Sequence, residues 1–244
     1  MSRNFELLSQ FETDLGTSDN HKQSKVKQVS SSAFANSYVG DICKDEIVRL
    51  VQRIFLSNED SAPRRVVFCG VDSENGSSVV CAQTARVLAS IISQPVCIVD
   101  AKIRTPLLVQ KVGSNSPAPV SNIDHSQQAN CEQMDTNLWL AGPELLAEGF
   151  GAILSVDKVR RRLAEMLTSF EYVLIDAPGA IVSGDATILG QAADAAVLVI
   201  EANSTRRLTA QKAKEALDAS GVRLLGTVLH NRTFPIPEKL YKRL

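Results

Sequence analysis

The sequence predicts a three-layer α/β/α domain around a mostly parallel central sheet, and three observations lead to that fold class. Short, continuous apolar runs recur along the chain, as is typical of parallel strands buried on both faces. Amphipathic stretches with helical spacing separate most of these runs. The chain has 244 residues, of which 44% are hydrophobic and 22% are charged, so it is long enough to bury the core of one large domain. Strands that alternate with helices favour a mostly parallel sheet.

Each element follows from its local pattern. The first is a helix over residues 44–56, because Ile47, Val48, Val51, Ile54 and Phe55 recur at helical spacing. The expected strands, all apolar runs, cover residues 66–69, 96–99, 138–141, 172–175, 196–200 and 224–229. Further helices are expected directly after residues 76–78, over 155–170, and over 205–219 behind a capping Ser204.

The composition divides the chain into two zones. Residues 1–40 are rich in Ser, Asn, Gln and Lys and are expected to form a flexible polar tail. Residues 41–244 are expected to form the folded domain. Within that domain, residues 112–133 are polar and contain proline, and their length is compatible with a lid, a partner site or a mobile loop.

Charge and apolar patterning exclude several function classes. The chain carries 26 basic and 27 acidic residues, so it lacks the basic excess with which proteins neutralise nucleic-acid phosphates. It has no apolar run of about 20 residues, and its start, MSRNFELLSQ, lacks the apolar core of a signal peptide. The five cysteines show no C-x-x-C spacing, which favours buried, reduced thiols over a zinc site. We therefore expect a cytoplasmic protein that does not bind nucleic acid.

Polar residues follow three of the expected strands, where a parallel sheet binds its ligands. The first strand runs into a loop that ends at Gly76, Ser77 and Ser78, and two others end at Asp100 and Asp176. A P-loop cradles phosphates with backbone N–H groups, places one lysine on the β- and γ-phosphates and one hydroxyl on Mg²⁺. This loop has the glycine and the hydroxyl but not the lysine. Ser78, Asp100 and Asp176 supply the hard oxygen ligands that Mg²⁺ prefers.

The order of these motifs resembles that of the bacterial tyrosine kinases of polysaccharide synthesis (BY-kinases), which are related to the Min and Par ATPases. The resemblance covers roughly residues 42–232. The family's P-loop reads here Ser73-Glu-Asn-Gly-Ser-Ser, its second Walker motif Val99-Asp-Ala-Lys-Ile-Arg-Thr-Pro, and its Walker B motif Ile175-Asp-Ala-Pro. The resemblance implies a P-loop NTPase-like fold, ATP or ADP with Mg²⁺ as cofactors, and catalytic roles for Asp100 and Asp176 if the protein is active. It also implies nucleotide contacts from Gly76, Ser77, Ser78, Lys102, Arg104, His230 and Asn231.

The departures from the family are concentrated in the chemistry. Ser77 replaces the P-loop lysine, Glu74 replaces a loop glycine, and Lys102 replaces an aspartate of the second Walker motif. Losing one charge-assisted hydrogen bond weakens ground-state binding by about 10 to 100-fold. Losing a cation that stabilises the transferring phosphoryl group costs about 10³ to 10⁵ in rate. Lys102 could supply that cation by reaching the γ-phosphate, or it could pair with Glu74 instead.

Two further features are open to more than one interpretation. Glu46 and Arg49 fit the family's oligomer motif, Glu-x-x-Arg-x-x-Arg, whereas its third position is Gln52, with Arg53 next to it. These charges either join subunits into a homo-oligomer or simply face solvent. Tyr241 stands where the family has a cluster of phosphorylated tyrosines, and it is either a phosphoacceptor or an ordinary surface residue.

The resemblance and its departures together predict a catalytically degenerate BY-kinase-like protein. It would regulate or scaffold the synthesis or export of a surface polysaccharide. Its implied partner is the cytoplasmic end of a membrane chain-length regulator, which would place it peripherally at the inner membrane. One alternative is an active ATP-dependent tyrosine autokinase, because Ser78, Asp100 and Asp176 are retained. A Par- or Min-type positioning ATPase is the second, disfavoured by the balanced charge and by the absence of an amphipathic C-terminal helix.

Overall fold

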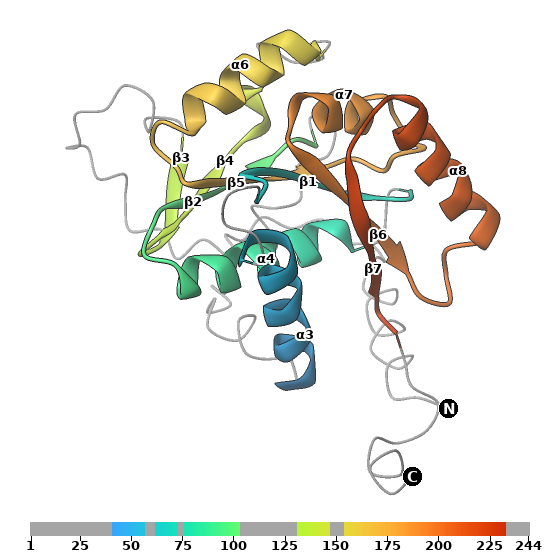
Figure 1. Cartoon of the computed structure of the whole chain (residues 1–244), viewed down its shortest axis with the longest axis horizontal. Coiled ribbons are helices and arrows are strands. Elements are labelled where there is room, and N and C mark those ends of the chain that lie inside the picture. The colour runs from blue at the N-terminus through green and yellow to red at the C-terminus, as the bar shows by residue number, and fades with distance from the viewer. Residues whose placement is uncertain (1–40, 57–61, 73–75, 103–130, 147–153, 233–244) are drawn as a thin grey trace, which may run out of the picture. The chain divides into compact units, whose positions relative to one another are not determined.

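The computed structural model describes residues 41–56, 62–72, 76–102, 131–146 and 154–232. In these ranges the strands form one sheet in the order β3-β4-β2-β5-β1-β6-β7 (Figure 1). Every neighbouring pair is parallel except β3 and β4, which are antiparallel. The strands are β1 Arg65–Gly70, β2 Val96–Asp100, β3 Cys131–Asp135, β4 Leu138–Ala141, β5 Tyr172–Ala177, β6 Ala195–Glu201 and β7 Leu224–His230. The mostly parallel sheet is confirmed.

Helices cover both faces of this sheet. They are α3 Asp41–Val51, α4 Ser77–Ile91, α6 Val156–Met166, α7 Asp185–Ala192 and α8 Arg207–Ala219, with a π-helical turn η1 Gln52–Leu56 and a 3-10 turn η3 Pro143–Leu145. Residues of α6, α7 and α8 pack into one apolar cluster with the sheet, and residues of α3, η1 and α4 pack into the other (Figure 1). The three-layer prediction is therefore confirmed.

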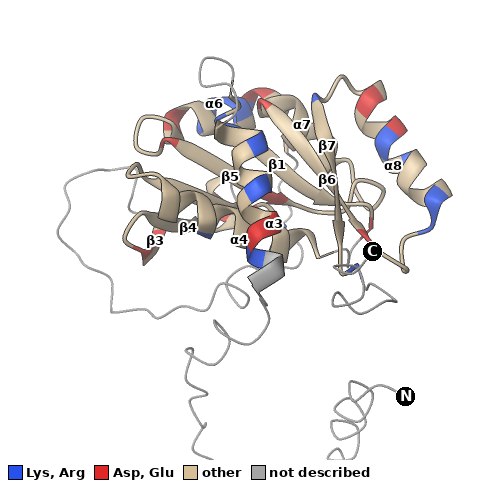
Figure 2. Cartoon of the chain, turned by 60° about the horizontal axis from the view of Figure 1, so that its bottom comes forward, with Lys and Arg blue, Asp and Glu red and all other residues tan. Residues whose placement is uncertain are grey.

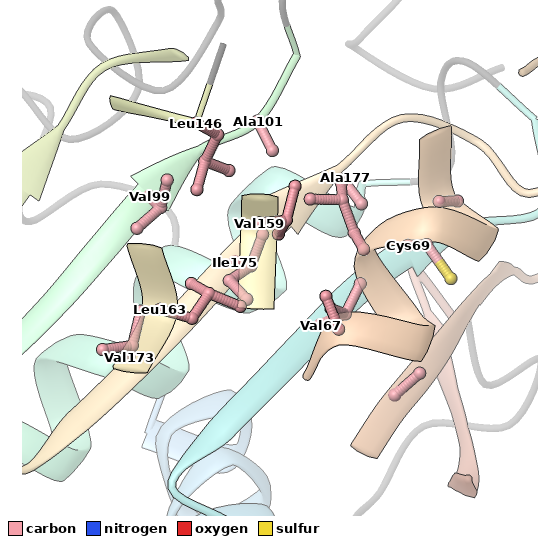
Figure 3. Packing of buried hydrophobic residues seen from close by; sticks show 14 of the residues in the cluster. Val67, Cys69, Val99, Ala101, Leu146, Val159, Leu163, Val173, Ile175 and Ala177 are labelled. Carbon is pink, nitrogen blue, oxygen red and sulfur yellow. The ribbon is translucent and has the colours of Figure 1, made fainter. Parts of the chain in front are cut away.

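Alternate residues of each strand belong to the two clusters. In β1, Val67 and Cys69 face the layer of α6 to α8, whereas Val66 and Phe68 face α3 and α4. Figure 3 shows Val67 in the first cluster together with Leu163 of α6. Both faces of the central strands are thus apolar, which explains their unbroken apolar runs.

The strand β3 was not expected. Its first residues, 131–133, fall in the segment predicted as a loop, and the remainder of that loop lies outside the described residues. The strand alternates between half-buried and exposed residues and contains two acidic residues, so it lacks the continuous apolar run of a central strand. It pairs antiparallel with β4 at the edge of the sheet. The antiparallel edge explains why a search for parallel strands misses it.

Several helix boundaries differ from expectation, and the helix expected over 155–170 covers only Val156–Met166. The first helix ends at Val51 and continues as the π-helical turn η1; this wider turn buries both Ile54 and Phe55, and the Phe55 ring meets Tyr172 edge to face at 5.3 Å. The last helix begins at Arg207, so Ser204 is not its cap. Thr205 Oγ1 instead accepts a hydrogen bond from the backbone N–H of Glu201 at 3.2 Å, which holds the turn after β6.

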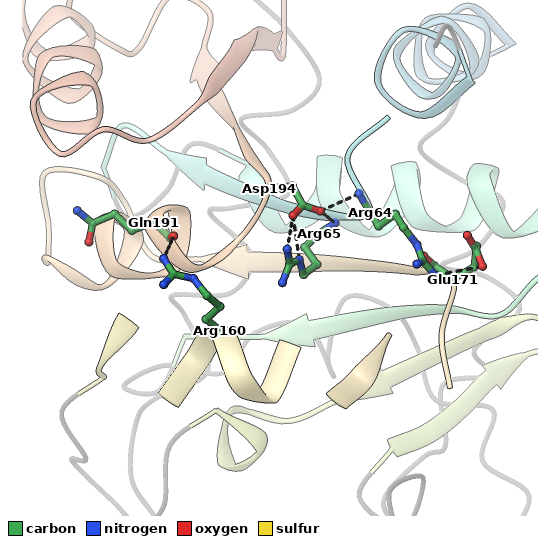
Figure 4. A network of polar contacts seen from close by, with 6 residues as sticks. All are labelled: Arg64, Arg65, Arg160, Glu171, Gln191 and Asp194. Carbon is green, nitrogen blue, oxygen red and sulfur yellow. Dashed lines mark hydrogen bonds and ion pairs between the residues drawn. The ribbon is translucent and has the colours of Figure 1, made fainter. Parts of the chain in front are cut away.

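A half-buried ion pair holds the start of β1 beside the residue that precedes β6. Asp194 accepts hydrogen bonds from the backbone N–H groups of Arg64 at 2.9 Å and Arg65 at 2.8 Å, and from the Arg65 guanidinium (Figure 4). Burial acts to raise the pKa of Asp194, but these bonds from Arg65 and Arg64 outweigh it and lower the pKa below the usual 3.8. The pair sets the register of the strand that leads into the Gly76 loop.

Surface charge and thiols complete the description. Figure 2 shows basic and acidic residues together on α3 and on α8. Cys69, Cys81 and Cys97 are free and buried, and burial, aided by the Asp176 charge, raises the pKa of Cys69 to about 12. The expectation of buried, reduced thiols is confirmed for these three. Among the helices in the described ranges, none is long and apolar enough to span a membrane.

Candidate functional site

The ends of β1, β2 and β5 bring the expected polar residues together. Asp100 and Asp176 are the last register pair of β2 and β5, and both are fully buried. Helix α4 begins at Ser77, directly after its N-cap residue Gly76. Ser77 and Ser78 are buried as well. Two carboxyl groups and two hydroxyl groups therefore share a site that is largely closed to water.

A lysine ammonium lies in the middle of these groups. Lys102, which is only 8% exposed, places its Nζ 2.6 Å from Ser78 Oγ and 3.3 Å from Ser77 Oγ. The same Nζ is 3.1 Å from Oδ1 of Asp176. An ammonium group has three hydrogens to donate, and these three oxygens can accept all of them.

The backbone holds Lys102 in this position. Its own N–H donates to Oδ1 of Asp100 at 3.0 Å, and the preceding N–H, of Ala101, donates to the carbonyl of Asp176 at 3.0 Å. The chain therefore leaves β2 along a fixed path beside β5. Ser77 adds a long hydrogen bond of 3.4 Å to Oδ1 of Asp176, so the helix start and both strand ends form one network.

Burial dominates the electrostatics of Asp176. Loss of hydration raises the pKa of this carboxyl group above its usual value, while the Lys102 charge and the hydrogen bond with Ser78 oppose the rise. Its second oxygen, Oδ2, is buried and has no hydrogen-bond partner among the described residues. A buried acceptor without a partner costs free energy. Such unpaired groups are found at functional sites more often than in ordinary cores.

Two glycines near the site allow close approach between neighbouring segments. Gly76 has a φ of 73°, and a Cβ added there would lie 2.2 Å from Cδ2 of His230. The His230 imidazole therefore packs directly on the start of α4. A Cβ at Gly179 would lie 2.4 Å from the carbonyl oxygen of Asp72, so the segment after β5 packs on the chain leaving β1. Both positions require glycine for close approach.

The remaining expected residues are distributed differently. The side-chain amide of Asn231 donates a hydrogen bond to Glu201 at 3.3 Å. Glu46 and Arg49 are exposed on α3. Arg53 lines a cavity of about 260 Å³ between η1 and the first residues of β7, apart from the strand ends that hold Lys102. Glu74, Arg104 and Tyr241 lie outside the described residues.

The arrangement does not fit Mg²⁺ while Lys102 is in place. The ion takes six oxygen ligands in near-octahedral geometry and retains several waters. Here Ser78 Oγ and Asp176 Oδ1 already accept hydrogen bonds from an ammonium, and a second cation on the same oxygens would be repelled. Ser78, Asp100 and Asp176 have the right donor atoms, but the site is already provided with positive charge.

The pairing of Lys102 with Asp176 was not anticipated from the sequence, which suggested Glu74 or a phosphate as its partner. One signal was available. Asp100 and Asp176 end neighbouring buried strands, so a basic residue two positions beyond Asp100 lies within reach of both carboxylates. A buried carboxylate needs a compensating charge, and Lys102 was a candidate for it within the same motif.

Comparisons with known proteins agree with the fold and with the order of the motifs. No family model matches the sequence. The chain is 28% identical over 186 residues to the tyrosine-protein kinase YwqD of Bacillus subtilis, covering 73% of this chain and 77% of the kinase. Among solved structures, the chimerical protein CapA2B2 superposes with a TM-score of 0.64 at 21% identity, covering 84% of this chain and 91% of that one.

Further structural neighbours extend this likeness. The kinase domain of the Escherichia coli tyrosine kinase ETK has a TM-score of 0.62 at 15% identity, covering 88% of this chain and 86% of that chain. The MinD cell division protein of Aquifex aeolicus is more distant, with a TM-score of 0.51 at 18% identity, covering 74% of this chain and 72% of that chain. The fold is P-loop NTPase-like, as in these structural neighbours. The chain is thus similar to bacterial tyrosine kinases over most of its length, and the resemblance seen in its motifs is confirmed.

Proposed function

We propose that this chain acts by binding rather than by phosphotransfer, as a catalytically degenerate relative of the BY-kinases. In this role it regulates or scaffolds the synthesis or export of a surface polysaccharide, and its partner is the cytoplasmic end of a membrane chain-length regulator. The polysaccharide setting and the partner rest on the resemblance to the BY-kinases. A peripheral location at the inner membrane follows from that partner.

One observation supports loss of phosphotransfer above all others. The Lys102 ammonium is held by Ser78 Oγ at 2.6 Å and by Asp176 Oδ1 at 3.1 Å. Phosphotransfer in this class of fold depends on a P-loop lysine, on a metal held by the loop hydroxyl and the Walker B aspartate, and on a base. Ser77 stands in place of the P-loop lysine. Lys102 contacts the hydroxyl and the aspartate that would hold the metal.

A direct test is whether the protein phosphorylates itself. The purified chain is incubated with ATP and Mg²⁺, and phosphotyrosine is measured by mass spectrometry. We expect none on Tyr241 or elsewhere. Phosphotyrosine that forms with ATP and disappears in Asp100→Asn would overturn the proposal and favour the alternative of an active autokinase, for which Asp100 and Asp176 are retained at the strand ends.

The regulatory role needs a test in cells. A strain that lacks the chain is complemented with wild type, Asp100→Asn or Tyr241→Phe, and its surface polysaccharide is quantified. Because binding is the proposed activity, all three should restore the amount and chain length equally. Restoration by wild type alone would show that chemistry at these residues is needed and would contradict the scaffold role.

A further inference from the structure

The partners of Lys102 are the residues that the sequence assigns to a divalent cation. Nζ lies 2.6 Å from Ser78 Oγ and 3.1 Å from Asp176 Oδ1. The backbone N–H of the same residue donates to Asp100 at 3.0 Å. All three expected magnesium ligands thus contact one lysine.

The charges of the buried groups point to the same role for Lys102. Asp100 and Asp176 are fully buried register partners, and two buried carboxyl groups side by side need positive charge close to them. In the described part of the site, the Lys102 ammonium contacts Asp176, and Asp100 accepts the backbone N–H of the same residue. The Lys102 side chain is nearly closed to solvent, at 9% exposure, so this ammonium is a structural member of the site and not a mobile surface charge.

A short stretch of backbone tethers Lys102 to the site. Lys102 follows Asp100 by two residues, and the backbone between them is fixed by hydrogen bonds to Asp100 and to the Asp176 carbonyl. A group attached to the site by a short chain has a very high effective concentration there. A free ion must therefore compete with a tethered ammonium, and it must do so against the repulsion of like charges.

We propose that the Lys102 ammonium is a built-in replacement for the divalent cation, which makes this site independent of metal. The inference rests on the proposed function and deepens it, because it names the physical reason for the lost phosphotransfer. Ser77, Ser78, Asp100 and Asp176 stay assembled without Mg²⁺. Any phosphate-bearing ligand that binds at the start of α4 does so as the metal-free anion, and chelators leave its affinity unchanged.

The test is a titration of the ¹⁵N-labelled wild-type chain with Mn²⁺, followed by NMR. Mn²⁺ broadens the amide signals of residues close to it, so it reports on this site separately from exposed carboxylates. We expect the signals of Ser78, Asp100 and Asp176 to keep their intensity at millimolar Mn²⁺, and the melting temperature to be the same in Mg²⁺ and in EDTA. Selective broadening of these three signals in wild type would overturn the proposal.

A substitution tests the role of the lysine itself. Lys102→Asp restores the acidic residue of the related kinases and should create Mn²⁺ binding, seen as broadening of the same signals and as a melting temperature that rises with metal. Lys158→Asp makes the same charge change at an exposed position of α6 and should do neither. Broadening that is equally weak in Lys102→Asp and in Lys158→Asp would contradict the replacement.

If Lys102→Asp does not fold without metal, refolding in Mn²⁺ but not in EDTA supports the same conclusion, and failure to refold in either contradicts it. The wild-type titration stands in any case. Its outcome is also distinct from that of the phosphotyrosine assay. A metal-binding wild type that forms no phosphotyrosine would overturn this inference and leave the proposed function intact.

Discussion

Asp100 and Asp176 are register partners at the ends of β2 and β5, and both carboxyl groups are withdrawn from solvent. Two acidic groups in this relationship would repel each other strongly in a protein interior. They are tolerated here because Lys102 donates its backbone N–H to one and its ammonium to the other. The stability of the sheet edge and the chemistry of the site therefore depend on the same side chain.

Removing the Lys102 charge should be strongly destabilising. Lys102→Met keeps most of the side-chain volume but leaves Asp176 without its cation, so the free energy of unfolding should fall by about 3 to 5 kcal/mol. Urea denaturation measures this. Lys158→Met, on the exposed side of α6, is the matched control and should change little. A double variant with Asp176→Asn should regain part of the loss, and equal losses in both lysine variants would contradict this account.

Restoring the P-loop lysine alone should not restore nucleotide binding. Ser77 Oγ is 3.3 Å from the Lys102 ammonium, so Ser77→Lys brings a second cation into a crowded, buried position. The double variant Ser77→Lys/Lys102→Asp removes that conflict and should bind ATP about 10 to 100-fold more tightly than wild type. Calorimetric titration with ATP compares the three proteins. The prediction fails if the single variant binds as tightly as the double one.

Gly179 should tolerate no side chain, in contrast to Gly184. A Cβ at Gly179 would lie 2.4 Å from a backbone carbonyl oxygen of Asp72, whereas a Cβ at Gly184 meets nothing within 4 Å. Gly179→Ala must displace the chain that leads from β1 toward the loop, so we expect a loss of about 1 to 3 kcal/mol. Gly184→Ala should be neutral or slightly stabilising. Thermal unfolding of the two variants side by side checks the contrast, and equal melting temperatures would refute it.

The Asp194 ion pair should make stability depend on acid pH. Because its pKa is lower in the folded chain than the usual 3.8, the pair contributes stability above that value, and the contribution is lost as the pH falls through the folded pKa. Asp194→Asn should cost about 1.5 kcal/mol at neutral pH, at the lower end for charged hydrogen bonds, since the Asp194 side chain is 25% exposed.

Urea denaturation of wild type and Asp194→Asn as a function of pH measures this contribution. The difference between the two should shrink steadily below about pH 3.8. Asp157 is a suitable control, because its side chain in the pair with Arg160 is 86% exposed. Asp157→Asn should leave stability unchanged at every pH. A difference for Asp194→Asn that stays constant into acid would show that the lost stability is not electrostatic.

The sequence predicts most of the fold because the signals that carry it are local. The apolar runs at 66–69 and 172–175 are each long enough to indicate a buried strand, and the alternation with helices implies the layers. The strand at Cys131–Asp135 gives no such signal, since it lies at an edge and pairs antiparallel. The turn at Gln52–Leu56 is equally hidden, because a π-helical turn differs from an α-helix in hydrogen bonding and not in composition.

The sequence predicts which residues form the site but not which of them contact each other. Ser78, Asp100 and Asp176 can be placed at strand ends by topology alone. Which of these oxygens meets Lys102 depends on the register of β2 against β5, and register is a property of the whole sheet. The packing of His230 on Gly76 has the same origin, since it joins the last strand to the loop after the first.

The strand order has a consequence for the synthesis of the chain. The central strand β1 is made early, but its sheet neighbours are β5 and β6, and the contact of Arg65 with Asp194 spans 129 positions. At about 5 to 20 residues per second, roughly 6 to 26 s pass on the ribosome before those neighbours exist. During that interval the apolar face of β1 and β2 that α6, α7 and α8 cover in the folded chain stays exposed, whereas α3 and α4 can already pack on the other face. A translational pause before β6 emerges should therefore prolong the exposure of that face.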